Sequence, residues 1–158
     1  MPGEPSSIAT GAASSEDVMT RAEMLRFFER RQMAYDNLDA AMLAADYAED
    51  CEVESPTGGP HTGRPAVQKV LEVVFAAFRD MKTSTDSLVI EGNRVAQIVS
   101  VEGTDLGGFL GMSAGGKPFK LAAVFLYEFR GRQIVKERRI YDFTGLLTQI
   151  GLLKIRPV

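Results

Sequence analysis

The chain has 158 residues, of which 45% are hydrophobic and 25% charged, and its formal net charge is −3. This length and composition are typical of one globular domain with a full hydrophobic core. The slightly acidic balance argues against nucleic acid or an anionic membrane surface as a partner. The longest apolar run, 121–127, is far shorter than the roughly 20 residues that cross a bilayer.

The cysteine and histidine content excludes several kinds of site. The single cysteine, Cys51, cannot form an internal disulfide and favours a reducing, cytoplasmic location. The only histidine is His61, so no Cys/His cluster predicts a metal site, and no cofactor is expected. Residues 1–15 are rich in Pro, Gly, Ser and Ala and contain no signal-peptide core. We expect them to be a disordered tail before one domain at 16–151, with a short tail at 152–158.

Two helices are predicted at the start of the domain. Helical spacing predicts the first from about residue 15 or 20 to residue 36, with one face formed by Met24, Phe27, Phe28, Arg31 and Tyr35. Asn37 is expected to cap a second, shorter helix that runs to Tyr47.

A strand and a third helix follow. Alternating residues predict the strand at 51–55, which the Pro/Gly-rich run 56–60 ends. The third helix begins near Gly63, with Pro65 in its first turn, where the missing N–H costs nothing. Its core-facing positions are Val67, Val70, Leu71, Val74, Phe75 and Phe78.

The second half of the chain predicts antiparallel strands at 83–90, 94–104, 117–130 and 133–143, then a short amphipathic helix. The turn between the last two strands is Gly131-Arg132, with glycine at the first central position as a type II′ hairpin requires.

The last hairpin separates two faces of the expected sheet. With a two-residue turn, one face carries Phe119, Leu121, Ala123, Phe125, Tyr127, Phe129, Ile134, Lys136, Arg138, Ile140 and Asp142. The opposite face is half apolar and half charged, which suits solvent or a dimer interface. Because the first face is more aromatic, we expect the helices to cover it. Asp142 and Arg138 would therefore face an apolar pocket between helices and sheet.

The predicted fold is an α+β cone, in which a curved antiparallel sheet wraps around the N-terminal helices. Several segments also match one known family: 36–43 leading into 47–51, His61-Thr62-Gly63-Arg64-Pro65, the loop 107–111, and the end from Tyr141 to Gly151. Together they resemble the SnoaL-like polyketide cyclases of the nuclear-transport-factor-2-like superfamily, over about 21–151. The resemblance implies a cystatin-like α+β barrel, and a superfamily that includes cyclases, isomerases, epoxide hydrolases and binding modules.

The resemblance also implies site residues. It implies an acid/base aspartate on the last strand, which matches Asp142. Many relatives carry a histidine before the Phe-Leu-Gly loop, where this chain has Asp105. The related ketosteroid isomerases use an aspartate in an Asp-Pro-x-Gly turn, where this chain has Ser55, which cannot act as that base unaided. An epoxide hydrolase needs an Asp–Arg–Asp set, which Asp142, Arg138 and Asp105 could supply.

Each carboxylate has more than one interpretation. Asp142 is either a general base with a pKa raised by burial, a cap that accepts N–H bonds at the start of the last helix, or an ion-pair partner of Arg138. Asp105 is either a second pocket acid or a turn residue bonded to its own backbone, and the turn is the more common case. The glycine-rich loop 107–116 is expected to form a pocket rim, with Phe109 and Met112 as lid residues.

Two functions are therefore predicted. The first is a cofactor-independent cyclase- or isomerase-type enzyme that acts on an apolar or polyketide-like molecule, with Asp142 as acid/base and Asp105 as a possible partner. The second is a non-catalytic small-molecule-binding module, and a homodimer is expected in either case. The predicted ligand-binding residues are Phe28, Gln32, Tyr35, Ser55, Leu71, Phe75, Phe109, Phe125, Arg138 and Ile140.

Overall fold

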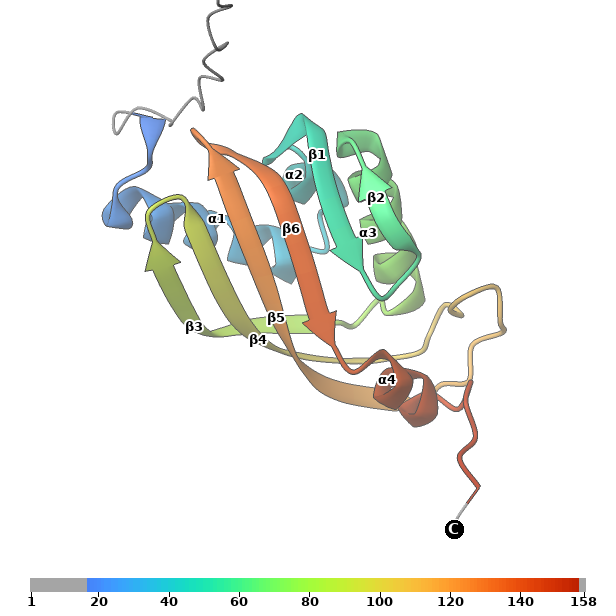
Figure 1. Ribbon diagram of the computed structural model, residues 1–158. Helices are drawn as coiled ribbons and strands as arrows, with labels where there is room; N and C mark the ends of the chain where they lie inside the picture. Colours follow the sequence, from blue (N-terminus) through green and yellow to red (C-terminus); the bar gives the residue numbers. More distant parts are fainter. Residues whose placement is uncertain (1–16, 157–158) are drawn as a thin grey trace, which may run out of the picture.

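The computed structural model describes residues 17–156 as helices packed on the inner face of one curved sheet (Figure 1). The expected tail at 1–15 lies outside these residues. The elements are α1 (Arg21–Asp36), α2 (Ala40–Ala44), β1 (Tyr47–Ser55), β2 (Gly59–Thr62), α3 (Arg64–Ala77), β3 (Lys82–Glu91), β4 (Arg94–Thr104), β5 (Pro118–Arg130), β6 (Gln133–Tyr141) and α4 (Phe143–Gln149).

The boundary between α1 and α2 differs from the prediction. α1 begins after Thr20, whose hydroxyl accepts from the Glu23 N–H in a capping box. Asn37 ends α1 and does not start α2; its side chain donates to the Met33 carbonyl oxygen. Leu38 then has a positive φ of 50°, which no helix accommodates, so α2 starts only after Asp39. The predicted second helix is thus wrong beyond residue 44, and β1 already begins at residue 47.

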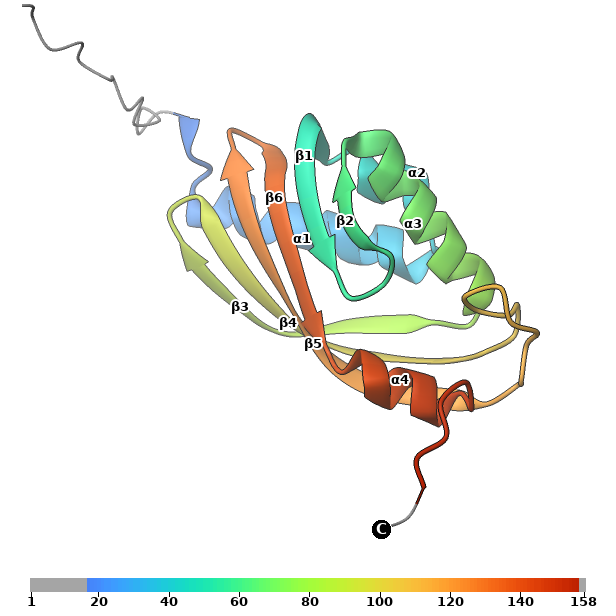
Figure 2. The same ribbon diagram turned by 45° about the vertical axis from the view of Figure 1, so that its right-hand side comes forward.

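The sheet has six strands in the order β2-β1-β6-β5-β4-β3, and α1, α2 and α3 lie on one side of it (Figure 2). All neighbours are antiparallel except β1 and β6, which are parallel, so the sheet is mixed and not wholly antiparallel. β2 was not predicted. Gly58 and Gly59 have positive φ angles of 76° and 75°, so the run expected to end the strand instead turns it back into a hairpin.

A β-bulge in β6 decides which residues face the helices. The predicted two-residue turn is confirmed, since Arg130 pairs with Gln133 and Gly131 has a φ of 59°. However, the register shifts between the Phe129–Ile134 pair and the Glu128–Lys136 pair, which leaves Val135 as an extra residue. An extra residue reverses the side on which every later side chain lies.

The predicted inner face of β6 is therefore wrong after the bulge. Glu137 and Arg139 point toward the helices, with side chains 0% and 9% exposed. Arg138 and Ile140 lie on the outer face, and their exposed fractions are 67% for the Arg138 side chain and 47% for Ile140. The predicted inner face of β5 is correct, since Phe119, Ala123, Phe125, Tyr127 and Phe129 are all buried.

The far end of the sheet is closed by α4 and by the loop between β4 and β5 (Figure 2). The Gln149 side chain holds α4 to β5, because its amide bonds the Lys120 N–H at 2.8 Å and the Lys120 carbonyl oxygen at 3.1 Å. α3 contributes the predicted apolar stripe, in which Val67, Val70, Leu71, Phe75 and the following Phe78 are buried.

Candidate functional site

A cavity of about 90 Å³ lies between α3, the inner face of the sheet, α4 and the β4–β5 loop. Its walls are mainly apolar and aromatic. Arg139 is the one charged side chain that lines it in the part of the chain described, and the hydroxyl-bearing residues are Tyr35, Ser55, Thr57 and Tyr141. The aromatic walls are formed by Phe78, Phe109, Phe119 and Phe125.

Arg139 is held in place by Glu137, two residues earlier on the same face of β6. Its Nε donates to Glu137 Oε1 at 2.8 Å and its Nη2 to Oε2 at 3.2 Å. No described residue accepts a hydrogen bond from Nη1, and the guanidinium lies 5.8 Å from the centre of the Phe125 ring. Burial by itself disfavours the charged form, but the Glu137 carboxylate outweighs it and raises the pKa of Arg139 well above its usual range. The cavity therefore contains a permanent cation with one free donor group.

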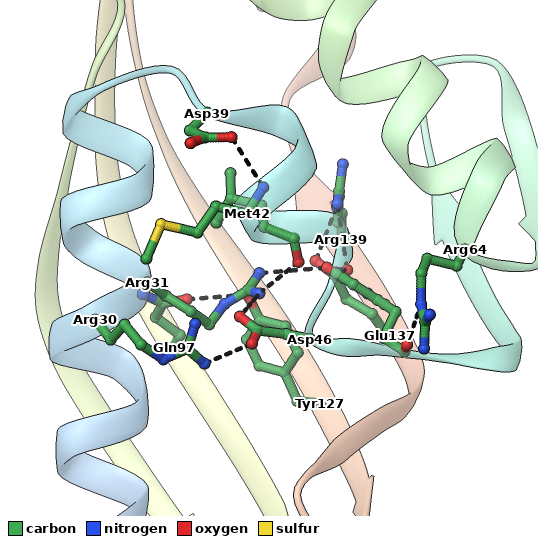
Figure 3. Close-up of polar contacts among 12 residues, drawn as sticks. Arg30, Arg31, Asp39, Met42, Asp46, Arg64, Gln97, Tyr127, Glu137 and Arg139 are labelled. Atoms are coloured by element: carbon green, nitrogen blue, oxygen red, sulfur yellow. Dashed lines mark hydrogen bonds and ion pairs between the residues drawn. The ribbon is translucent and has the colours of Figure 1, made fainter.

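Glu137 belongs to a buried polar network that reaches α1 (Figure 3). The Tyr47 hydroxyl donates to Glu137 Oε2, and Arg31 Nη2 donates to the Tyr47 oxygen at 3.4 Å. Arg31 also donates from Nη1 to Asp46 Oδ2 at 2.8 Å. Burial, and next the Glu137 charge, raise the pKa of Tyr47, so this phenol stays protonated and donates.

The network explains how the fold tolerates these charges. Arg31 is 1% exposed and Asp46 8% exposed, and a buried ion is stable only when it is paired and hydrogen-bonded. The two buried cations, Arg31 and Arg139, are matched by two anions, Asp46 and Glu137, and Asp46 also pairs with the more exposed Arg30 at 2.5 Å. The network therefore fixes the position of Arg139 from the side opposite the cavity.

The hydroxyl groups form a second polar element of the cavity. Thr57 Oγ1 and the Tyr141 hydroxyl are hydrogen-bonded to each other, which joins the β1–β2 turn to the end of β6. Ser55 Oγ accepts from the Thr57 N–H at 3.2 Å, and His61 Nε2 lies 3.1 Å from the Thr57 carbonyl oxygen. Since Arg139 and Tyr141 are two residues apart on the inner face, they present a cation and a hydroxyl to the same cavity.

Asp142 lies outside this cavity lining, at the start of α4. It is exposed, and its Oδ1 accepts from the Gly145 N–H at 2.8 Å, which makes it the N-cap of α4. A Cβ at Gly145 would lie 2.2 Å from Asp142 Oδ2, so a side chain there would force the Asp142 carboxylate to shift. The predicted position of Asp142 on the covered face is wrong, because of the bulge at Val135. Its role as a base stays a prediction.

Comparisons with known proteins agree with this fold. A model of the SnoaL-like polyketide cyclase family matches residues 22–150, most of the chain. The chain belongs to the SnoaL-like polyketide cyclase family. Among curated proteins, no sequence matches it.

Solved structures place the SnoaL-like chain in the nuclear-transport-factor-2-like fold, as predicted. TsrD from Streptomyces laurentii has a TM-score of 0.75 at 21% identity, covering 85% of this chain and 99% of that one. AclR from Streptomyces galilaeus has a TM-score of 0.74 at 22% identity, covering 87% and 91%. TerC, co-crystallised with polyporic acid, has a TM-score of 0.66 at 16% identity, covering 80% and 97%. At these identities the likeness shows the fold alone.

Asp105 organises the β4–β5 loop of this SnoaL-like protein. It is fully buried, and its carboxylate accepts from the Gly108 N–H at 3.1 Å and the Gly115 N–H at 3.0 Å. The interpretation as a turn residue bonded to nearby backbone is confirmed. Asp105 does not line the cavity, so a role as a second pocket acid stays a prediction.

The other predicted ligand-binding residues fall into two groups. Tyr35, Ser55, Leu71, Phe109 and Phe125 line the cavity. Phe28 and Phe75 are buried in the core but do not line it, whereas Gln32, Arg138 and Ile140 lie elsewhere.

Three of these placements are corrections. The Gln32 side chain donates to the Thr83 carbonyl oxygen at 2.6 Å, so it connects α1 to β3. Arg138 faces outward and forms an ion pair with Glu54 at 3.4 Å, while Ile140 faces outward beside it. The Asp–Arg–Asp set of an epoxide hydrolase is not assembled, because Arg138 and Asp142 are exposed whereas Asp105 is buried within its own loop.

The sequence did not predict the polar residues of the site, which are Arg139, Tyr141 and Thr57 in the cavity lining and Glu137 behind Arg139. Alternation placed Glu137, Arg139 and Tyr141 on the outer face, and the bulge moved them inward. One available signal was the Glu-x-Arg spacing, which puts opposite charges on one strand face where they can be buried as a pair.

In the described residues, no three His, Cys, Asp or Glu side chains gather to hold a metal ion. None of the described helices is long and apolar enough to cross a membrane.

Proposed function

We propose that this SnoaL-like protein binds an apolar, oxygenated small molecule in the inner cavity and catalyses its enolisation and ring closure without a cofactor. The observation that carries the proposal is the polarity of the cavity. Its walls are aromatic and aliphatic, and its one charged group is the Arg139 guanidinium next to the Tyr141 and Thr57 hydroxyls. Such a site suits a molecule with an apolar body and a carbonyl or enolate oxygen.

The chemistry follows from that oxygen. When a water molecule or hydroxide ion from solvent removes a proton from the carbon next to a ketone, negative charge develops on the ketone oxygen. Arg139 Nη1 and the Tyr141 hydroxyl are donors of the kind that stabilise this charge, and Glu137 keeps the guanidinium from turning away. The enolate carbon then attacks a second carbonyl carbon in the same molecule, a carbon–carbon bond forms, and the new alkoxide takes up a proton. TerC, a protein with this fold, was co-crystallised with the small molecule polyporic acid.

The alternative is a binding module of the same fold. It is favoured by one observation: no carboxylate from the described residues lines the cavity, so the lining itself supplies no strong base. In that case Arg139 and Tyr141 recognise the ligand oxygen and no proton is moved.

Exchange of carbon-bound protons separates the two functions. The protein is incubated in D₂O with an aryl 1,3-diketone and with an aryl monoketone, and deuterium uptake next to the carbonyl is followed by NMR. An enzyme accelerates uptake above the buffer rate, and Arg139→Met and Tyr141→Phe each reduce the acceleration by tenfold or more. A binding module binds the ketone by calorimetry but leaves the exchange at the buffer rate. If Arg139→Met exchanges as fast as the wild type, the assigned oxygen site is wrong.

We also propose that the outer face of the sheet forms a homodimer. Apolar side chains form two rows there across paired strands, and Val89, Ile98, Leu126 and Ile140 are each at least 37% exposed. An open groove of about 530 Å³ crosses this face between acidic and basic side chains, including Glu54 and Arg138. Apolar rows bordered by both signs of charge suit a second copy of the same face.

A further inference from the structure

We propose that Phe109 determines the size of ligand that the cavity accepts, and that the loop carrying it, residues 106–116 (the lid loop), opens to admit the ligand. The inference rests on the proposed use of the inner cavity. It adds a specificity-determining residue and an entry route.

The cavity is small for a ligand of several rings. Its volume is about 90 Å³, whereas an apolar cavity of roughly 150 Å³ holds a single benzene ring. Pockets for drug-sized ligands are larger still, at roughly 300–1,000 Å³. A wall of this cavity must therefore move before a fused-ring molecule can bind.

Phe109 is the wall residue that stands on a long irregular segment. Most other lining residues lie in α1, α3, α4 or the strands, whose backbones are held by regular hydrogen bonds. The Phe109 ring is 2% exposed and packs on the Phe78 ring with centroids 5.0 Å apart. Its side chain thus occupies space inside the fold while its backbone belongs to a surface loop.

The lid loop is fastened at its ends and lightly held between them. Leu106 and Gly107 donate to the Ala77 carbonyl oxygen at 3.0 and 2.9 Å. The Asp105 carboxylate holds Gly108 and Gly115, so it joins the two ends of the loop. A Cβ at Gly107 would lie 1.9 Å from the Ala76 oxygen, so this end must remain glycine to pack on α3.

The middle of the loop has little to hold it except Phe109. One described backbone hydrogen bond lies within it, from the Met112 N–H to the Phe109 carbonyl oxygen at 3.0 Å. Leu110 and Met112 are 50% and 58% exposed, so Met112 does not act as the predicted lid residue inside the cavity. Withdrawal of the Phe109 ring would free the loop between two fixed hinges and enlarge the cavity at the same time.

A size series of apolar fluorescent or absorbing probes tests the proposal: indole, 2-naphthol and 1-hydroxypyrene. Equilibrium affinity and stopped-flow association rates are measured for the wild type, Phe109→Ala and Phe119→Ala. Phe119 is the matched control, because it also lines the cavity and contacts Phe78, with centroids 4.8 Å apart, but stands on β5. Both variants enlarge the cavity, whereas only Phe109→Ala removes the side chain that the lid loop carries into it.

We expect Phe109→Ala to raise the affinity for 1-hydroxypyrene at least tenfold more than that for indole, and to raise the association rate about tenfold. Phe119→Ala should leave the association rate near that of the wild type. Equal association rates in the two variants, or an unchanged size preference in Phe109→Ala, overturn the proposal. Phe109→Leu keeps an apolar side chain at this position and should give intermediate probe affinities and association rates. It replaces the alanine variant in the test if that variant does not fold.

The probe-binding experiment can fail or succeed independently of the proton-exchange experiment that tests the proposed function. Phe109→Ala could shift the size preference while no form of the protein accelerates proton exchange. That result would support the role of Phe109 and contradict the proposed enolising activity. If no probe binds to the wild type or to any folded variant, the cavity is not a ligand site and both proposals fail.

Discussion

The two faces of β6 each carry an ion pair between an arginine and a glutamate, and the two pairs differ in their exposure to solvent. On the inner face, Glu137 and Arg139 form a two-bond pair with side chains 0% and 9% exposed. On the outer face, Arg138 meets Glu54 at 3.4 Å, with side chains 67% and 69% exposed. The chemistry of the residues is the same, so solvent access alone decides that one pair fixes a cavity cation and the other has little effect on stability.

The largest expected loss of stability follows from removal of the Glu137 carboxylate on the inner face. Glu137→Gln leaves the Arg139 cation buried without a counter-charge, and breaking such a pair costs about 3–5 kcal/mol. The free energy of unfolding is measured in urea at pH 7. Glu54→Gln, the matched change on the outer face, should cost less than about 1 kcal/mol. Similar losses in the two variants would contradict the assigned difference between the faces.

A substitution on the outer face of the sheet should instead change the oligomeric state of the protein. We expect the 17.2 kDa chain to behave as a dimer in light scattering, and Leu126→Lys to convert it to a monomer by burying a charge in the interface. Val73→Lys, at a similarly exposed apolar residue on α3, is the control and should leave the mass unchanged. A wild-type monomer at working concentrations would remove the dimer proposal.

A smaller effect on stability is expected at Asp142, which follows the end of β6. Asp142→Ala removes the α4 cap and should cost about 1 kcal/mol, whereas Asp142→Asn keeps an oxygen acceptor and should cost almost nothing. Neither change should alter ketone binding, because Asp142 lies outside the cavity lining. Loss of proton exchange in a stable Asp142→Asn protein would instead establish Asp142 as the base.

The smallest effect concerns an exposed carboxylate far from the cavity. Hydrogen bonds from the Thr20 backbone N–H and then from Arg132 lower the pKa of Glu23 from 4.5 to about 2. Its contribution to stability is therefore present above the unfolded pKa and is lost as the pH falls from about 4.5 toward 2. A titration followed by NMR should give the lowered value. Glu23→Gln should weaken this part of the acid dependence.

Many features of the fold follow from local patterns. The capping box at Thr20 and Glu23, the apolar stripe of α3 and the glycine turn at residue 131 each depend on neighbours in the chain, and the structure has all three. The family resemblance also led to the correct fold. Tyr35, Leu71 and Phe125 line the cavity because they are large residues on elements whose inner faces were predicted correctly. Ser55 and Phe109, which also line it, were predicted from the family resemblance and from the loop at 107–116.

The rest was decided by contacts between distant segments. Alternation in β6 is ambiguous once one residue can bulge, and the sequence at Val135 does not mark the bulge. The tertiary structure selects it because it turns Glu137 and Arg139 together to the inner face, where Glu137 meets Tyr47, and leaves Arg138 in solvent. The amino-acid sequence by itself thus determined α1, α3, the turn at residues 131–132 and the family. Only the tertiary structure decided which charged side chains reach the cavity, since the energy of a charge depends on its surroundings.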